Sequence, residues 1–338
     1  MGHEVLLVGR KLPNSVPLSK YAFRQKRLHC YFRKGKWFYL EFNLRLFLFL
    51  LSQKMDAINS VDLDTLLPGV LVSRLRGKRI IYDAHEYFSE TPEVVRRPTI
   101  QKIWSALAQW CIPRVHGAYT VGPALAQILG DRYGVDFGCI RNLPFGKKRT
   151  APPRKESPPV LLYQGALNEG RGLEAILRAM PDIPNAQLWL AGEGDLSRFL
   201  RKLAHQLSLN DRVRFLGYVR PEDLTDLTPR ATIGLNLLEN RGLSYYYSLA
   251  NKAFDYLQAE VPAIHMDFPE YRALSEQYGG MVLLEDLSPA HLAYTLTNLL
   301  NDPQQLAQLI EDCHSAAPHL TWEQEQHRLH AFFPLPAT

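Results

Sequence analysis

Apolar and polar positions along the chain form two series of the same kind. Short apolar runs alternate with stretches in which apolar residues recur every three or four positions, a pattern typical of a parallel sheet covered by helices. In the first series we predict strands at 4–8, 57–60, 79–82, 118–120 and 137–140, and helices near 63–75, 99–110 and 122–132. Residues 1–144 are therefore expected to form one Rossmann-like α/β domain.

The second series predicts strands at 160–164, 187–191, 213–216, 232–236, 263–265 and 281–284, with helices near 171–180, 196–207, 221–229, 248–259, 288–300 and 303–313. The segment 145–159 is charged and rich in proline, as linkers are. We expect two doubly wound parallel-sheet domains facing across a cleft, the second over 160–317. A C-terminal helix over 318–338 can pack back on the first domain. Such sheets bind ligands at the carboxyl ends of their strands, which places the expected site in the cleft.

Composition narrows the class of protein. The 338 residues are 46% apolar and 22% charged, as in an ordinary globular protein. The four cysteines show no CxxC pair or metal-ligand spacing, which fits a reducing cytosol. The start of the chain lacks the pattern of a signal peptide, and the longest apolar run, Leu46 to Leu51, is far too short to span a bilayer. We expect a cytoplasmic protein.

Charge is distributed unevenly between the halves. Residues 1–158 hold 26 Lys and Arg against 12 Asp and Glu, whereas the remainder holds 13 against 22. Either two solvated surfaces attract each other, or the basic half meets an anionic partner such as phospholipid, a lipid-linked phosphate or nucleic acid. Basic residues alternate with aromatic ones over Arg24–Tyr39. That segment favours peripheral binding to an anionic membrane surface, with an ordinary solvated loop as the alternative.

A glycine-rich turn marks the first candidate site. A strand ends at Gly165, and a helix is expected to begin at Arg171 and Gly172. Backbone N–H groups at a helix start attract anions, and Arg171 adds a guanidinium suited to phosphate. The alternative is a plain strand-to-helix turn with a solvated arginine.

The second candidate site is a helix near 248–259, which the residues from Ser248 to Asn251 can cap. Lys252 and Asp255 are three apart, so we expect them to share an exposed face near the helix N-terminus. A cation there suits a diphosphate, and a carboxylate one turn later suits ribose hydroxyls. A surface ion pair is the alternative.

Two further motifs lie in the first half. Asp62-Leu-Asp64 spells the DxD of metal-dependent transferases, but it opens a predicted helix, which favours capping and surface roles. His85 follows the strand at 79–82, where active-site residues collect. It can bond a sugar hydroxyl or move a proton. Alternatively it is a structural histidine bonded to Glu86 or to a backbone carbonyl.

Several segments in order carry a family resemblance: 61–66, 82–88, 141–144, 165–172, 188–195, 213–219, 248–262 and the tail around Trp322. Together they resemble the family 4 glycosyltransferases of GT-B fold, which are retaining and metal-independent and use a nucleoside-diphosphate sugar as donor with no cofactor. The resemblance covers nearly the whole chain. It implies transfer of a hexose to a saccharide or lipid-linked acceptor, in bacterial surface polysaccharide or glycolipid synthesis at the inner face of the cell membrane.

The resemblance also implies residue roles. Arg171 and Lys252 fall beside the donor diphosphate, and Asp255 falls at the ribose. Gly217 and Tyr218 fall where backbone groups meet the base. Glu239 and Gly242 match the segment that holds the transferred sugar, which His85 reaches from the other domain. The catalytic residues implied are His85 and Glu239, and the donor-binding set is Gly165, Arg171, Gly217, Tyr218, Gly242, Asn251, Lys252 and Asp255.

Three departures from the family pattern stand out. Ala166 occupies a position where many relatives have an arginine of the phosphate clamp. Glu239 and Asp255 are sixteen apart instead of eight, so we interpret 241–247 as the region of a local insertion. Related enzymes also open with a strand, a turn and a helix before a segment like 2–9. We therefore expect the strand at 4–8 to border a gap or an exposed edge.

Other functions remain open at this point. A non-catalytic or impaired relative that binds a nucleotide sugar or scaffolds a partner is compatible with these departures. A nucleotide-dependent oxidoreductase is disfavoured, because no predicted strand is followed by GxGxxG. A nucleic-acid binder has only the basic half in its favour and no recognition motif, so no nucleic-acid partner is expected.

Overall fold

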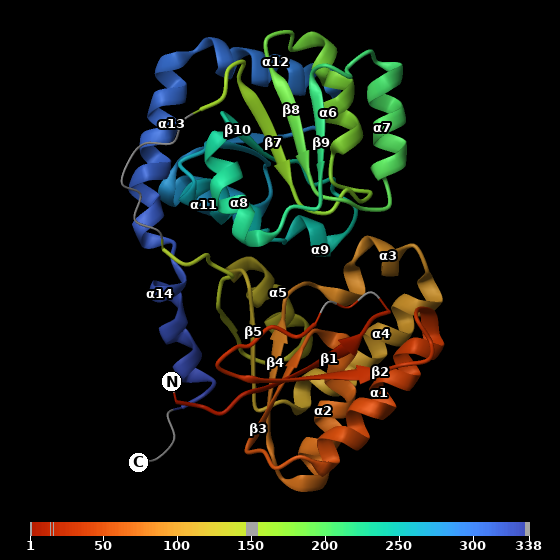
Figure 1. Ribbon diagram of the computed structural model, residues 1–338. Coiled ribbons are helices and arrows are strands. Elements are labelled where there is room, and N and C mark those ends of the chain that lie inside the picture. Colours follow the sequence, from red (N-terminus) through yellow and green to blue (C-terminus); the bar gives the residue numbers. More distant parts are fainter. Residues whose placement is uncertain (1, 14, 16, 147–154, 335–338) are drawn as a thin grey trace. The chain divides into compact units, whose positions relative to one another are not determined.

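The computed structural model describes residues 2–13, 15, 17–146 and 155–334. It divides into two compact units (Figure 1). Unit 1 holds the residues up to Ile140 together with the described residues from His327 onward, and unit 2 holds Arg141 to Gln326. Of the expected linker 145–159, residues 147–154 lie outside the described part of the chain.

Unit 2 is built on six parallel strands in the order β12-β11-β10-β7-β8-β9. The strands are β7 (Val160–Gln164), β8 (Gln187–Ala191), β9 (Val213–Gly217), β10 (Ile233–Asn236), β11 (Ala263–Met266) and β12 (Met281–Leu284). From the central β7 the chain runs outward through β8 and β9, then returns to β10 on the other side. The order therefore reverses between β7 and β10, as in doubly wound sheets.

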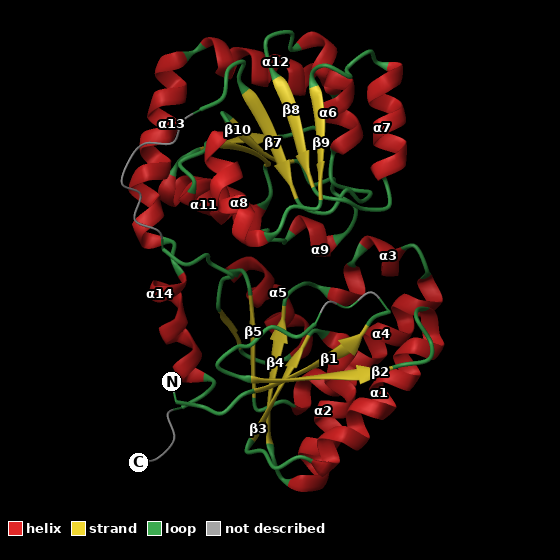
Figure 2. Ribbon diagram, in the orientation of Figure 1, coloured by secondary structure: helices red, strands yellow, loops and turns green. Residues whose placement is uncertain are grey.

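Helices cover both faces of this sheet (Figure 2). They are α6 (Leu173–Ala179), α7 (Ser197–Gln206), α8 (Pro221–Leu227), α9 (Leu243–Tyr246), α10 (Asn251–Gln258), α11 (Pro269–Tyr278), α12 (Pro289–Asn301) and α13 (Pro303–Ala316). The sequence analysis anticipated most of them. It missed α9 and α11.

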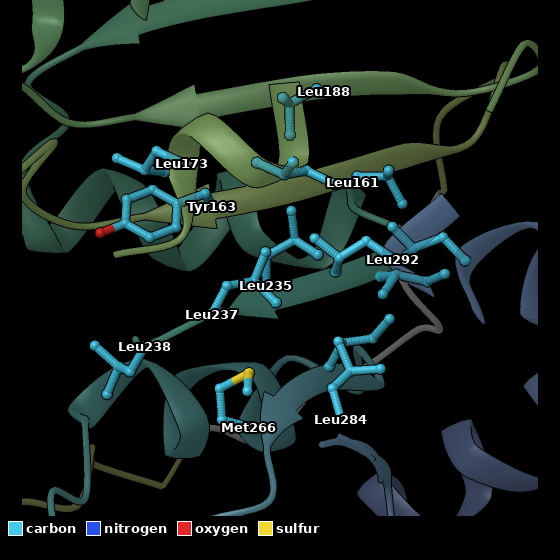
Figure 3. Close-up of a cluster of buried hydrophobic side chains, with 14 of the residues drawn as sticks. Leu161, Tyr163, Leu173, Leu188, Leu235, Leu237, Leu238, Met266, Leu284 and Leu292 are labelled. Atoms are coloured by element: carbon cyan, nitrogen blue, oxygen red, sulfur yellow. The ribbon is translucent and has the colours of Figure 1, made fainter. Parts of the chain in front are cut away.

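The core of unit 2 shows why β7 reads as a continuous apolar run. Leu161 and Tyr163 belong to the large cluster drawn in Figure 3, whereas Val160 and Leu162 belong to a second cluster. Successive side chains of a strand point to opposite faces, so β7 is buried on both.

Unit 1 contains two separate parallel sheets. Four strands run in the order β3 (Ala57–Val61), β4 (Arg79–Ala84), β5 (Gly117–Thr120) and β6 (Phe137–Cys139). A two-stranded sheet pairs β1 (Leu6–Lys11) with β2 (Arg24–His29). Within the described residues β1 pairs with β2 alone. The expected gap beside this segment stays a prediction.

The helices of unit 1 include one that the sequence pattern did not reveal. They are α1 (Gly35–Ser52), α2 (Leu63–Arg76), α3 (Pro92–Val95), α4 (Pro98–Cys111) and α5 (Pro123–Tyr133). The alternative of an ordinary solvated loop over Arg24–Tyr39 was wrong, because β2 and the first turn of α1 occupy much of this segment. No helix in the described ranges is long and apolar enough to cross a bilayer.

Instead of one helix over 318–338, the described residues up to 334 form several short ones. They include α14 (Trp322–Glu325) and the 3-10 helix η6 (Gln326–Ala331). The ring of Phe332 lies 4.9 Å from that of Tyr119. A Cβ on Gly138 would lie 2.6 Å from the Phe332 ring, so a glycine lets the tail pack against β6.

Candidate functional site

The strand reversal in unit 2 creates the setting for a site. Neighbouring strands β7 and β10 continue into loops that lead in opposite directions, which opens a crevice at their carboxyl ends. Gln164 and Gly165 lie at the end of β7, and Asn236 ends β10. Any polar side chain brought to this point meets the place where doubly wound sheets bind their ligands.

One tyrosine, Tyr256, anchors helix α10 to strands β7 and β10. The Tyr256 hydroxyl lies 2.9 Å from the carbonyl oxygen of Leu162 on β7 and 3.2 Å from that of Leu235 on β10. Gly234 makes room for the ring, because a Cβ there would lie 2.6 Å from it. The first turn of α10, which carries Lys252, is therefore fixed at the strand ends.

Lys252 is buried, with 8% of its surface exposed. Its ammonium lies 3.8 Å from the centroid of the Tyr163 ring and forms no ion pair with any described residue. Burial, followed by the nearby charge of Arg171, holds the Lys252 pKa well below its usual value. The prediction that Lys252 and Asp255 share an exposed face was wrong for the lysine, because the Tyr163 ring and the strand ends cover it.

Arg171 lies in the loop between β7 and α6. Its guanidinium carbon is 4.9 Å from the Tyr245 ring centroid, and its Nε is buried with no hydrogen-bond partner in the described structure. Gly172 has φ 64°, and a Cβ there would lie 2.4 Å from the carbonyl oxygen of Leu237, so only glycine fits. Because Arg171 depresses the pKa of Lys252, the two cations are within electrostatic reach of each other.

Asp255 points into the same region but is held by a different partner. Gln164 Nε2 donates to Asp255 Oδ2 at 2.9 Å, and Thr228 Oγ1 donates to Gln164 Oε1 at 2.8 Å. Burial raises the Asp255 pKa to about 6, against the opposing effects of Gln164 and Lys252. With Phe145 and residues of α8, Asp255 lines a cavity of about 130 Å³. It is not part of a surface ion pair.

Two buried polar side chains lie on the strands beside this site. The Nδ2 of Asn236 and the Nδ1 of His265 are 3.0 Å apart. Asn236 Oδ1 and His265 Nε2 have no hydrogen-bond partner among the described residues. Burial, assisted by the charge of Lys252, lowers the His265 pKa to about 3, so this imidazole is neutral.

Glu239 is bonded to the residues that follow it and to the loop before α6. Its backbone N–H donates to the carbonyl of Gly170 at 2.9 Å, and its carboxylate accepts from Arg241. Arg241 also donates to Glu169. Gly242, at φ 132°, precedes the short helix α9, and this helix delivers Tyr245 to Arg171.

The remaining predicted donor residues lie farther out. Gly217 ends the edge strand β9 with φ 70°, and Tyr218 after it is 74% exposed. Asn251, the first residue of α10, is exposed. The helix begins without a side-chain cap, so the expected capping by residues 248–251 was wrong. The hydroxyl of Tyr271 instead accepts from the backbone N–H of Ala250 at 3.1 Å.

His85 follows β4 in unit 1, as predicted. Its Nε2 lies 3.2 Å from Asp83 Oδ1, and its backbone N–H donates to Asp62 Oδ1 at 2.9 Å. The hydrogen bond that the His85 imidazole donates to Asp83 raises the His85 pKa against the effect of burial. About a third of the side chain stays exposed, so the ring is both oriented and reachable.

The capping and surface roles expected for Asp62 and Asp64 were wrong. Asp62 stands at the start of α2, but its carboxylate makes no cap and holds His85 instead. Both carboxylates are largely buried, which raises the pKa of Asp62 and brings that of Asp64 to about 6. Among the described residues, no group of three or more His, Cys, Asp or Glu side chains is arranged to hold a metal ion.

Sequence reasoning missed several residues of the unit 2 site. They are Tyr163, Gln164, Asn236, Tyr245 and His265. Tyr163, Gln164 and Asn236 had a usable signal, since each stands at or near the carboxyl end of a predicted central strand. Tyr245 had none, because it lies at 241–247, where the sequence predicted neither a strand nor a helix.

Comparison with known families identifies what kind of protein has this architecture. A model described as glycosyl transferases group 1 matches residues 145–314, and one described as glycosyltransferase family 4 matches residues 1–146. The chain belongs to the family 4 (group 1) glycosyltransferases.

Individual relatives of this glycosyltransferase match over shorter stretches. An uncharacterized glycosyltransferase of Methanocaldococcus jannaschii is 38% identical over 77 residues, which is 22% of this chain and 20% of that protein. The lipopolysaccharide core biosynthesis glycosyltransferase LpsD of Rhizobium meliloti is 33% identical over 90 residues, 25% of this chain and 26% of that one. The matches thus span about a fifth to a quarter of these relatives' length.

A solved structure shares the fold over almost the whole chain. Anabaena HepE, in complex with UDP and glucose, superimposes with a TM-score of 0.72 at 15% identity, covering 93% of this chain and 87% of that one. The two units, each of parallel strands covered by helices, therefore form a GT-B fold, as the sequence resemblance implied. The expected doubly wound order is found in unit 2, whereas the four strands of the larger sheet of unit 1 follow one another in sequence order.

Proposed function

We propose that this glycosyltransferase is retaining and metal-independent and transfers a hexose from a nucleoside-diphosphate sugar to a saccharide or lipid-linked acceptor. The proposal places the reaction in bacterial surface polysaccharide or glycolipid synthesis. A role of LpsD in lipopolysaccharide core biosynthesis and the UDP and glucose held by HepE support this choice of pathway and donor.

One observation carries the proposal: a buried ammonium and a partly buried guanidinium lie at the strand reversal without a carboxylate to neutralise the ammonium. Burying an unpaired cation costs free energy unless an anion completes the site. A diphosphate at this place would restore the lowered pKa of Lys252 and satisfy the orphaned Nε of Arg171.

The main requirement of the transfer reaction is positive charge near the leaving group. A nucleoside diphosphate leaves as an anion, so stabilising the charge that grows on it lowers the barrier. Lys252 and Arg171 would supply that stabilisation without a metal ion. Asp255, set beside the 130 Å³ cavity, would accept hydrogen bonds from ribose hydroxyls, with Gly217 and Tyr218 nearer the base.

The roles proposed for Glu239 and His85 concern the transferred sugar. Glu239 would hold a sugar hydroxyl, which requires its carboxylate to share or leave its bond with Arg241. His85, oriented by Asp83, presents its exposed imidazole for a bond to a sugar hydroxyl.

A non-catalytic relative is the second candidate, and a specific observation favours it. Arg241 occupies the Glu239 carboxylate, and Ala166 removes half of the expected phosphate clamp. Such a protein would bind the donor without turning it over.

The test is a thermal-shift screen of UDP-, GDP- and CMP-sugars, followed by turnover of the donor that stabilises the protein most. A bound donor raises the melting temperature by mass action. We expect release of nucleoside diphosphate that persists in EDTA, and an NMR spectrum showing retained anomeric configuration. Binding without release would support the non-catalytic relative, and inversion or loss of activity in EDTA would contradict the proposed mechanism.

A further inference from the structure

Helix α1 of unit 1 exposes an apolar face. It buries Phe42 and Leu46 in a small cluster with Leu28 of β2. On its other side lies a row that we call the α1 stripe: Trp37, Leu40, Leu44 and Leu48, which are 54%, 61%, 56% and 56% exposed.

The spacing of the α1 stripe makes it continuous. Steps of three, four and four residues keep side chains on one face of a helix. From Trp37 to Leu48 the stripe extends about 16 Å at 1.5 Å per residue. The helix lies at the margin of unit 1 beside α2 (Figure 1). Single exposed leucines need no explanation, but a contiguous exposed row of them marks an interaction surface.

Basic and aromatic residues surround the start of this stripe. Residues 5–40 contain nine Lys and Arg and no Asp or Glu. The Lys36 ammonium lies 5.5 Å from the centroid of the Trp37 ring, so charge and stripe meet directly. Tyr31 and Phe32, just before the helix, are 77% and 50% exposed.

The nearest carboxylate does not offset this charge. Glu41 accepts hydrogen bonds from the backbone N–H groups of Tyr31 and Phe32 and pairs with Arg45. Glu41 thereby holds Tyr31 and Phe32 against the first turns of α1. The surface presented outward is basic, aromatic and aliphatic.

We propose that the α1 stripe and the basic residues that precede it in the segment 5–40 dock this protein on an anionic lipid surface. Leucine and tryptophan enter the acyl boundary, while the Lys and Arg side chains meet the lipid phosphates, as in helices that lie in the plane of an interface. A second copy of the chain is a poorer occupant, because two such basic surfaces repel each other. The inference rests on the proposed function only in that docking would bring the donor site to a lipid-linked acceptor.

Vesicle flotation with the full chain tests the proposal. Phosphatidylcholine vesicles are compared with vesicles containing 30% phosphatidylglycerol, at low and high salt. We expect binding at least tenfold stronger to the anionic vesicles, weakening as salt rises. The triple variant Leu40→Gln, Leu44→Gln, Leu48→Gln keeps good helix formers and should lose at least tenfold. Lys34→Gln or Lys36→Gln should each cost about fivefold.

The matched control is Tyr294→Gln, which changes a side chain that is 68% exposed on α12 of unit 2. It should bind as the parent does. Equal binding to neutral and anionic vesicles, or unchanged binding by the triple variant, would overturn the proposal. So would a dimer that the triple variant dissolves without any dependence on lipid. If the triple variant fails to fold, Leu44→Gln alone serves. UDP binding in solution is measured in parallel, so that failure of docking and failure of the donor site are told apart.

Discussion

The two units differ in the sign of their net charge and, in the opposite way, in the sign of the charges gathered at their strand ends. Residues 1–158 are strongly basic overall, yet the strand ends of unit 1 gather Asp62, Asp64 and Asp83. The rest of the chain is acidic overall, yet the strand ends of unit 2 gather Arg171 and Lys252. In each case the cluster opposes the net charge of its own half.

This contrast separates solvated charge from buried charge. A surface lysine or glutamate keeps its hydration and interacts weakly, so net charge reports on long-range partners. A buried charge loses its hydration, and its pKa then shifts towards the neutral form unless a partner of opposite charge compensates. In unit 2, burial and the charge of Arg171 depress the Lys252 pKa further than Asp255 raises it. In unit 1, burial is the main reason that the pKa values of Asp62 and Asp64 are raised.

The largest effect is expected from Lys252→Met, which removes the buried cation while keeping an unbranched side chain. Release of nucleoside diphosphate should fall by about 10²- to 10³-fold, the usual cost of one preorganised charge-stabilising group. The melting temperature should not fall, because an unpaired buried charge is lost. Single-turnover product release and thermal unfolding measure the two effects.

Lys202→Met is the matched control, because Lys202 is exposed on α7 of the same unit. It should change neither quantity. Full activity in Lys252→Met would show that the buried cation is not needed for catalysis. It would also contradict the contrast drawn between the two units.

Parts of this comparison could be predicted from the sequence. β7 and β8 lie where the apolar runs placed them, at 160–164 and 187–191, because strands buried on both faces read as uninterrupted apolar runs. Arg171 and Lys252 could be selected because each stands beside a helix start that follows a parallel strand.

Burial and long-range contacts could not be predicted. Lys252 is covered by Tyr163, a residue 89 positions earlier, and no local pattern records that contact. No pattern at 241–247 predicts α9, which brings Tyr245 to Arg171. Helix α1 was not predicted, because leucine and phenylalanine occupy nearly all its sides and its apolar positions therefore show no 3.6-residue period.

A second, smaller effect is the pH dependence of UDP binding. A bound diphosphate favours the charged form of Lys252, so binding takes up a proton once pH exceeds the lowered pKa of the free protein. Affinity should therefore fall as pH rises through that value, with a limiting slope of about tenfold per pH unit. Isothermal titration at several pH values from neutral upward measures it.

Two neighbours of Lys252 have pKa values below neutral pH. At pH 7 and above, Asp255, with a pKa of about 6, is mostly ionised, and His265, with a pKa of about 3, is neutral. Burial raises the Tyr163 pKa, so that hydroxyl keeps its proton. Lys252→Met should flatten the profile, and a variant that keeps the slope would assign the proton to another group.

The smallest effect concerns the acidic cluster of unit 1, through Asp64→Asn. The folded-state pKa of about 6 lies above the usual value of an aspartate, about 3.9, chiefly because of burial and then because of Asp62. The stability that Asp64 contributes is thus fully present below about pH 4 and is lost as pH rises through 6. At pH 7.5 the neutral asparagine should stabilise unit 1 by roughly 1 to 3 kcal/mol, since one pKa unit is worth about 1.4 kcal/mol. The gain should fade towards pH 4. Denaturant unfolding at pH 7.5 and 4.5 measures this difference, with the exposed Asp131→Asn as control. A gain of equal size at both pH values would mean that packing, and not the buried charge, explains the effect, and the acidic cluster would then no longer be the counterpart of the cationic one.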